Sequence, residues 1–310
     1  MLTKKRRRIL FWLSVIFFAA ILVPVFLFSF GYGLGPGFVL QKTGSIAITA
    51  SVTNAKVLVD AEASVIRKKN TSLITKSALV KNLIPGRYSV SVKKEGFWEW
   101  QKNLKVTPEK VTAREALLVP LEVKGEIIGT TSPVAKNNFK LPPSVQRFWE
   151  LPKTGEFLLL GEDKKFYRHN KPENKISTST LEILRKSKNS FFSEDEQEII
   201  VWDENKITLT WISDSDKMPF WMENEYYNSL STIEPLRDVR NYPKHTDYLI
   251  VKMSNGIFAV EKEVPQNNIF PLYKGRNPKI ISVENELLTI FDDNNYIKIV
   301  HYAEISVIAA

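Results

Sequence analysis

The sequence predicts a chain that is all-β apart from one N-terminal transmembrane helix. An apolar run without any charged residue covers residues 9–30. From Gly44 onward, short segments alternate apolar with polar residues, which is the period of half-buried strands. Beyond residue 144, a pattern of two strands joined by a turn recurs four times. We therefore expect a small β-sandwich followed by a β-propeller-like repeat domain of about four repeats.

The apolar run is long enough to cross a membrane. Its residues, 9–30, give roughly 33 Å of helix at a rise of about 1.5 Å each, against a hydrocarbon core of about 30 Å. Cations precede the run, which predicts a cytoplasmic tail over residues 1–8 and an exported remainder. A proline is tolerable inside such a helix. The residues assigned to this anchor are Lys4, Lys5, Arg6, Arg7, Arg8, Trp12 and Pro24.

A cleaved signal peptide is the competing interpretation of the same segment. The apolar run is longer than the usual 7 to 15 residues of a signal peptide. The residues from Phe28 to Tyr32 also offer no pair of small residues at cleavage spacing. These two features favour an uncleaved anchor, and the glycines that follow predict a flexible tether over residues 31–43.

The positive charge of the chain is unevenly distributed. The formal net charge is +9, of which residues 1–43 supply six cations and no acid. Residues 44–119 hold thirteen cations against six acids, and residues 120–310 hold 24 against 28. This distribution argues against a nucleic-acid partner. The basic small domain could contact phospholipid head groups or an anionic wall polymer. The stronger expectation is a solvated surface whose charge serves only solubility. Cysteine is absent, so disulfides and thiol chemistry are excluded.

The first exported domain is predicted over residues 44–119. Its segments GSIAITASVTNAKVLVD and LIPGRYSVSVKKEGFWEW resemble the PEGA domain, with paired strands, a Pro-Gly turn and a Lys-x-Gly-aromatic sequence. The resemblance implies an exported, often membrane-tethered β-sandwich of bacterial envelope proteins, without catalytic residues. One departure is the run from Arg67 to Asn70, which replaces the Gly-x-Thr-Pro turn of that family.

The aromatic residues at the end of the second segment are the candidate partner-binding feature. We expect a strand from Trp98 to Val106, which puts Trp98 and Trp100 on one face and Phe97 on the other. Exposed rings beside lysines could stack on sugars or lie at a membrane interface. The stronger expectation is that the rings pack in the sandwich core or against the next domain. The candidate residues are Lys93, Lys94, Trp98, Trp100 and Lys102.

A linker is expected over residues 120–143, and the repeat domain over residues 144–310. Each repeat has a short strand and turn followed by a hairpin, and the hairpins start at Glu156, Glu198, Tyr248 and Leu287. The run SFFSEDEQEIIVWDENKITL is similar to TolB-like and WD40-like propeller repeats, which have about this length. A ring of four or five blades, a truncated ring and an open stack of sheets all remain open.

Catalytic patterns are weak in this sequence. The histidines at 169, 245 and 301 lack metal-ligand spacing, and no Gly-x-Ser-x-Gly or phosphate-binding loop occurs. Neither a metal nor a cofactor is expected. Acid clusters could serve glycoside hydrolysis or bind Ca²⁺. They lie where turns are predicted, and turns favour such side chains. These acids are Glu194, Asp195, Glu196, Asp214, Asp216, Asp292 and Asp293.

The sequence therefore favours a non-catalytic protein of the cell membrane, single-pass, with a cytoplasmic N-terminus and extracytoplasmic domains. It would act as a scaffold or binding module of the envelope for a protein, glycan or cell-wall partner. One alternative is an extracytoplasmic hydrolase or lyase acting on polysaccharide. Another is a sensor or assembly subunit, for which a tail of eight residues leaves little signalling capacity. Further candidate contact residues are Arg168, Trp221, Tyr226, Tyr227 and Arg276.

Overall fold

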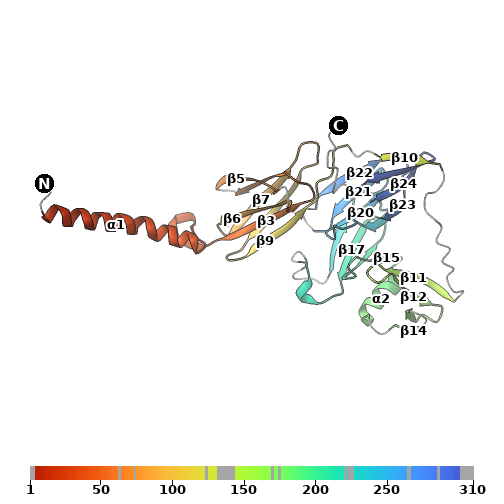
Figure 1. Cartoon of the computed structure of the whole chain (residues 1–310). Helices are drawn as coiled ribbons and strands as arrows, with labels where there is room; N and C mark the ends of the chain where they lie inside the picture. The colour runs from red at the N-terminus through yellow and green to blue at the C-terminus, as the bar shows by residue number, and fades with distance from the viewer. Residues whose placement is uncertain are drawn as a thin grey trace. The chain divides into compact units, whose positions relative to one another are not determined.

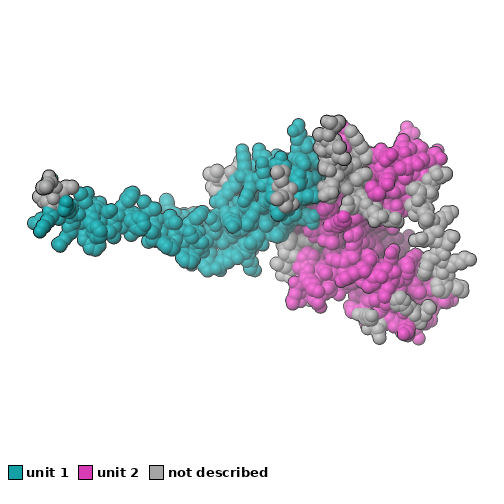
Figure 2. All heavy atoms as spheres, viewed as in Figure 1, with its two compact units in different colours: residues 1–118 teal, residues 119–310 magenta. Residues whose placement is uncertain are grey.

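The computed structural model is mostly β, with one long apolar helix at its N-terminal end, as the sequence predicted (Figure 1). The chain divides into two compact units, Met1–Leu118 and Val119–Ala310 (Figure 2). The described residues are 4–61, 64–72, 75–122, 125–130, 144–168, 171–173, 176–219, 222, 227–263, 267–284 and 287–300.

Helix α1 (Lys4–Ser29) is long and apolar enough to cross a membrane. None of its residues is buried in the chain. The helix begins five residues before the predicted span, because the cations Lys4 to Arg8 continue the helical turns. Pro24 lies inside the helix, and Ser29, whose hydroxyl donates to the carbonyl of Val25 at 2.8 Å, ends it.

The predicted flexible tether is instead a β-hairpin. Strand β1 (Tyr32–Leu34) pairs antiparallel with β2 (Leu40–Lys42), and a 3₁₀ turn, η1 (Pro36–Phe38), lies between them. At its base, the backbone N–H and the hydroxyl of Thr43 both donate to the carbonyl of Gly31, at 2.7 and 2.8 Å. An extended chain of this length would span about 40 Å. The prediction was wrong because these hydrogen bonds bring the two ends of the segment together.

Two sheets share the core of the first unit. The three-stranded sheet has the order β6-β3-β9, with β3 parallel to β9, and the four-stranded sheet has the order β5-β4-β7-β8. Alternate residues of β3, β4, β7 and β8 point into the core, as the period-two pattern predicted. The strands are β3 (Gly44–Ala50), β4 (Lys56–Ala61), β5 (Ser64–Asn70), β6 (Ser77–Leu83), β7 (Gly86–Lys93), β8 (Trp100–Val106) and β9 (Val111–Ala116).

The segment Arg67–Asn70, which departs from the PEGA pattern, is the end of strand β5 rather than a loop. The guanidinium of Arg67 donates to the carbonyls of Lys81 and Asn82, at 2.6 and 3.2 Å. The ammonium of Lys69 donates to the carbonyl of Leu79 at 2.7 Å. These two cations therefore satisfy carbonyls of edge strand β6 and join the two sheets along one side.

Four antiparallel sheets of four strands each form the second unit. We number them from first to fourth in the order in which their hairpins occur along the chain. Strands β12, β16, β20 and β24 begin at the four residues where the sequence predicted hairpins, which confirms those hairpins. The sheets are β11 (Val145–Leu151), β12 (Glu156–Gly161), β13 (Phe166–Arg168), β14 (Lys171–Pro172); β15 (Asn189–Phe192), β16 (Glu198–Trp202), β17 (Lys206–Trp211), β18 (Tyr227–Ser231); β19 (Asp238–Asn241), β20 (Tyr248–Met253), β21 (Gly256–Glu261), β22 (Ile269–Lys274); and β23 (Lys279–Glu284), β24 (Leu287–Asp292), β25 (Asn295–Val300), β10 (Gly125–Gly129).

Part of the predicted linker belongs to the last of these sheets. Strand β10, from residues 125–129, pairs antiparallel with β25 and completes the fourth sheet. The sequence did not predict this strand, because β10 has no neighbouring strand to form a hairpin with and pairs instead with β25, far along the chain. Residues 123–124 and 131–143 of the predicted linker lie outside the described residues.

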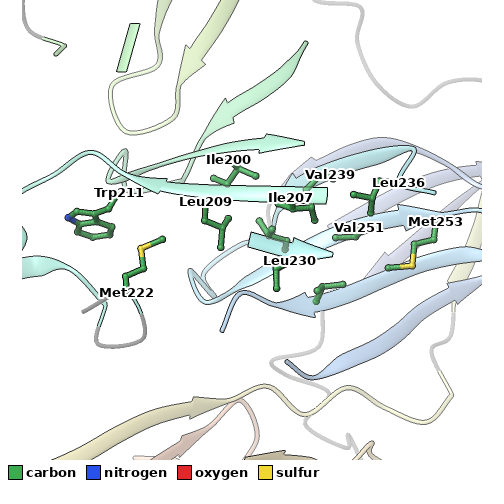
Figure 3. Close-up of a cluster of buried hydrophobic side chains, with 12 residues drawn as sticks. Ile200, Ile207, Leu209, Trp211, Met222, Leu230, Leu236, Val239, Val251 and Met253 are labelled. Carbon is green, nitrogen blue, oxygen red and sulfur yellow. The ribbon is translucent and has the colours of Figure 1, made fainter. Parts of the chain in front are cut away.

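Apolar clusters join neighbouring sheets of the second unit. Trp149, Leu158 and Phe166 of the first sheet pack with Phe192 and Ile199 of the second. Helix α2 (Thr178–Lys186) contributes Leu184 to this cluster. A second cluster joins the second and third sheets (Figure 3), and its labelled members are Ile200, Ile207, Leu209, Trp211, Met222, Leu230, Leu236, Val239, Val251 and Met253.

Candidate functional site

The outward side of the sheet β5-β4-β7-β8 carries a cluster of cations, which we call the basic sheet face. Cross-strand register places Lys56 opposite Lys93, and Arg87 opposite Lys105. Lys68 lies opposite Leu58, whose neighbours Val57 and Val59 point into the core. All five cations are exposed. Period-two alternation therefore gathers charges from four strands onto one surface.

The basic sheet face has little compensating negative charge among the described residues. Asp60 is the acid within its four strands, and Glu99, just before β8, lies 3.0 Å from the ammonium of Lys93. Ser89, Asn103 and Gln101 separate the cations. Like charges placed opposite each other on a sheet are destabilising. A polyanion bound across this face would relieve that repulsion.

The structure separates the predicted partner-binding residues. Lys93 belongs to the basic sheet face, but Lys94 lies in the following turn, where its ammonium donates to the carbonyl of Thr53 at 3.0 Å. The same ammonium lies 5.3 Å from the ring centroid of Phe97. Trp98 is 38% exposed and lies before strand β8.

Trp100 and Lys102, two of the candidate partner-binding residues, are not on the exposed surface; for Trp100 this is the core packing that the sequence also predicted. Trp100 is fully buried, and it sets the phase of β8, so that every second residue up to Val106 points inward. Lys102 shares this phase and is only 2% exposed. The predicted strand began too early, because the chain from Lys94 to Glu99 is a turn around Gly96, whose φ is 79°. Trp98 and Trp100 therefore do not share a face.

The predicted anchor residues all belong to helix α1. Lys4, Lys5, Arg6, Arg7 and Arg8 form the first turns of α1 and are exposed, with Trp12 one turn further on. The ring of Trp12 contacts that of Phe11 edge to face, at 6.0 Å between centroids. A cationic turn followed by an aromatic residue is typical of the boundary between head groups and hydrocarbon.

The acid cluster at 194–196 holds the turns of three consecutive sheets together. Glu196 accepts from the backbone N–H groups of Lys153 and Thr154 in the first sheet, at 2.8 and 3.2 Å. Glu194 accepts from the N–H of Lys244 in the third sheet at 3.2 Å. Both carboxylates therefore bind backbone amides of turns, in agreement with the predicted turn role.

A buried ion pair joins the second and third sheets. The ammonium of Lys262 lies 2.8 Å from Oε2 of Glu198, and both side chains are almost entirely buried. Burial raises the pKa of Glu198, although the charge of Lys262 opposes that shift. A carboxylic acid with a raised pKa is a common feature of active sites. Here, however, it is paired with a lysine at a junction between packed strands, which indicates a structural role.

Asp292 forms a comparable link between the third and fourth sheets. Its Oδ2 accepts from the hydroxyl of Tyr273 at 3.1 Å, and its Oδ1 accepts from the backbone N–H of Asn277 at 3.2 Å. Burial, followed by this hydrogen bond to the carboxylate, raises the pKa of Tyr273 to about 12. Gly275 is required beside it, because a Cβ there would lie 2.0 Å from Oδ2 of Asp292.

Among the remaining predicted residues, those that the structure describes do not converge on a reactive centre. His245 is buried against Tyr242, with 5.4 Å between ring centroids, and Arg168 pairs with Glu173 at 2.7 Å and Glu156 at 3.3 Å. Arg276 is exposed. The described residues contain no cluster of three His, Cys, Asp or Glu suited to a metal. His169, His301, Trp221 and Tyr226, and the side chain of Tyr227, lie outside the described residues.

Comparison with known proteins gives no family for this chain. No model of a protein family matches it, and no curated protein matches it. Among solved structures, the AfRom2 CNH domain is similar at 10% identity and a TM-score of 0.29, over 77% of this chain and 69% of that chain. The Bacillus anthracis TIE protein is similar at 14% identity and a TM-score of 0.24, over 75% of this chain and 48% of that protein's chain. The extracellular domain of the B. thetaiotaomicron hybrid two component system BT4673 is similar at 8% identity and a TM-score of 0.28. That similarity covers 84% of this chain and 29% of the other chain. Scores this low carry no argument about function.

Sequence reasoning missed most of the basic sheet face. It named Lys93 but not Lys56, Lys68, Arg87 or Lys105. The alternation of Arg87, Ser89, Ser91 and Lys93 against buried Tyr88, Val90 and Val92 was a usable signal within one strand. The neighbouring strands could not be added, because strand order and register come from long-range pairing.

Proposed function

We propose that this protein is a membrane-anchored, extracytoplasmic binding protein of the cell envelope. In this proposal α1 spans the membrane with its cationic end in the cytoplasm. The first unit is a PEGA-like β-sandwich whose basic sheet face contacts an anionic polymer of the envelope. The second unit is a propeller-like scaffold that presents loops to a protein or glycan partner.

The basic sheet face is the observation that carries this proposal. Its five cations come from four adjacent strands, and one acid, Asp60, accompanies them within those strands. A flat array of this kind suits a repeating polyanion better than a small ligand, because charges repeat along both. The propeller-like assignment is supported by four successive four-stranded sheets and by strand β10, which joins the start of the unit to its last sheet.

The test measures polymer binding by the full chain in nanodiscs of neutral phosphatidylcholine. The probe is poly(glycerol phosphate), with uncharged dextran as the matched polymer. The variant K56Q/K68Q/K105Q removes three cations of the basic sheet face. Each cation near an anionic surface changes affinity about fivefold, so we expect binding about a hundredfold weaker at low salt. The difference should shrink toward 1 M salt, where the Debye length falls to about 3 Å.

The control variant K164Q/K188Q/K206Q removes three exposed lysines from the second unit. It should bind the polymer within a few-fold of the unaltered chain. Equal losses in the two triple variants would mean that binding follows net charge and has no defined face. Equal binding of dextran and the phosphate polymer would contradict the electrostatic proposal.

A further inference from the structure

The tip of the hairpin between α1 and the first sheet is apolar and exposed. Phe38 is 88% exposed, Leu34 64% and Val39 60%, and Leu40 is also exposed. These four side chains belong to one turn and the adjacent ends of β1 and β2. Such a concentration of large apolar groups on a short hairpin is unfavourable in water, at about 25 cal/mol for each Å² of apolar surface.

The hairpin continues the uncharged part of the chain. No charged residue occurs between Arg8 and Lys42, so the uncharged segment runs well past the helix end at Ser29. Tyr32 lies at the start of the hairpin, and the ammonium of Lys42 lies 5.9 Å from its ring centroid. A tyrosine and a lysine that follow an apolar segment are typical of the membrane interface.

The base of the hairpin is held both to the segment after helix α1 and to the loop before β9. Thr43 bonds to the carbonyl of Gly31 through its N–H and its hydroxyl, and Lys42 pairs with Glu109. A Cβ on Gly33 would lie 2.8 Å from the side chains of both Ile84 and Thr43, so this strand packs closely against the loop before β7. The strands of the hairpin have only three residues each, and their tip therefore stays within about 10 Å of this base.

The tip also has an unusual backbone. Gly37 has a φ of 72°, and Phe38 follows it with a φ of 61°, in the left-handed region that a bulky residue rarely adopts. The N–H of Gly35 donates to the carbonyl of Val39 at 2.8 Å, and the N–H of Phe38 donates to that of Gly35 at 3.1 Å. These two hydrogen bonds close the turn and satisfy its backbone groups internally. The side chains of Phe38 and Val39 are exposed.

We propose that the hairpin tip inserts into the lipid interface next to the C-terminal end of α1, as a second membrane contact. This inference rests on the proposed membrane anchoring. Lipid is the occupant that these observations favour, because the hairpin is bonded to Gly31, two residues after the end of the helix, and its tip lacks charge. The first unit would then be held at the membrane surface by two contacts, a spanning helix and a short wedge.

Single-cysteine labelling tests this inference, because the chain contains no cysteine. The full chain is reconstituted in phosphatidylcholine vesicles with a spin label at V39C, at F18C in the middle of α1, or at N54C in a turn between β3 and β4. Accessibility to oxygen, which dissolves in lipid, is compared with accessibility to a water-soluble nickel complex. We expect an oxygen-to-nickel ratio at V39C several-fold above that at N54C and below that at F18C.

A V39C ratio equal to that of N54C, with F18C still in lipid, would overturn the wedge and leave the anchor intact. Low access of both reagents at V39C would show protein covering the tip and would also overturn it. A water-exposed F18C would refute the anchor and the wedge together. The variant F38S/L40S, combined with V39C, should raise nickel access several-fold. L121S/I233S, which removes two exposed apolar residues of the second unit, should leave it unchanged.

Discussion

The ion pair between Glu198 and Lys262 yields the sharpest prediction for the second unit. Replacing Lys262 by methionine keeps an unbranched side chain that is one atom shorter and removes its charge. Glu198 would then remain on β16, buried and without the ammonium that lies 2.8 Å from its carboxylate. Removing one partner of a buried pair costs about 3–5 kcal/mol, because an uncompensated charge stays in the interior.

Hydrogen exchange measured by mass spectrometry suits this prediction, because it reports each unit separately. A loss of about 3–5 kcal/mol corresponds to exchange faster by about two to three and a half orders of magnitude in peptides of β16 and β21. Peptides of β7 and β8 in the first unit provide an internal reference. The variant K206M, which alters an exposed lysine of β17, is the matched control and should change exchange little.

The pH dependence follows from the direction of the pKa shift. The pKa of Glu198 already lies above its ordinary value of 4.5, and losing Lys262 raises it further. A raised pKa in the folded state gives a contribution that is present below the unfolded pKa and lost as pH rises through the folded pKa. The destabilisation by K262M should therefore be largest near neutral pH and smaller near pH 4.5.

The double variant E198M/K262M separates charge from packing. Two methionines of similar volume should restore most of the stability, since buried pairs and apolar replacements are often equivalent. If the double variant exchanges as fast as K262M, lost packing and not an uncompensated carboxylate explains the effect. Exchange of K262M within tenfold of the unaltered chain would refute the whole argument.

Two further predictions concern the fourth sheet. Tyr273 should remain protonated at pH 11, because its pKa is about 12, and D292N should lower that pKa toward 10. The absorbance of tyrosinate, measured against Y273F as reference, reports the pKa of Tyr273 in each variant. The raised pKa gives the folded state a stabilisation that is present below about pH 10 and lost as pH rises through 12. Deleting residues 125–129 should speed amide exchange in β25 (Asn295–Val300) and leave β20 and β21 nearly unchanged, because β10 pairs with β25 alone. Unchanged exchange in β25 would show that the pairing contributes nothing to stability.

The candidate site was only partly predictable from the sequence. Lys93 and Lys102 look equivalent there, since they lie on either side of the aromatic run from Phe97 to Trp100. In the structure Lys93 is exposed and Lys102 is buried, because Trp100 sets the phase of β8. Similarly, Arg67 and Lys69 belong to the basic composition of the first unit but serve as donors to carbonyls of β6. Composition predicts that a domain is basic and says nothing about which cations face solvent.

The sequence by itself determined the helix, the strand alternation and the positions of the four repeated hairpins. These features depend on local patterns, namely apolar length, period-two alternation and turn-forming residues. Only the tertiary structure decided that residues 31–43 form a hairpin, that 125–129 complete the last sheet, and that five cations share one face. Each of these depends on pairing between distant segments, where register and strand order are set by packing and hydrogen bonds that no local pattern specifies.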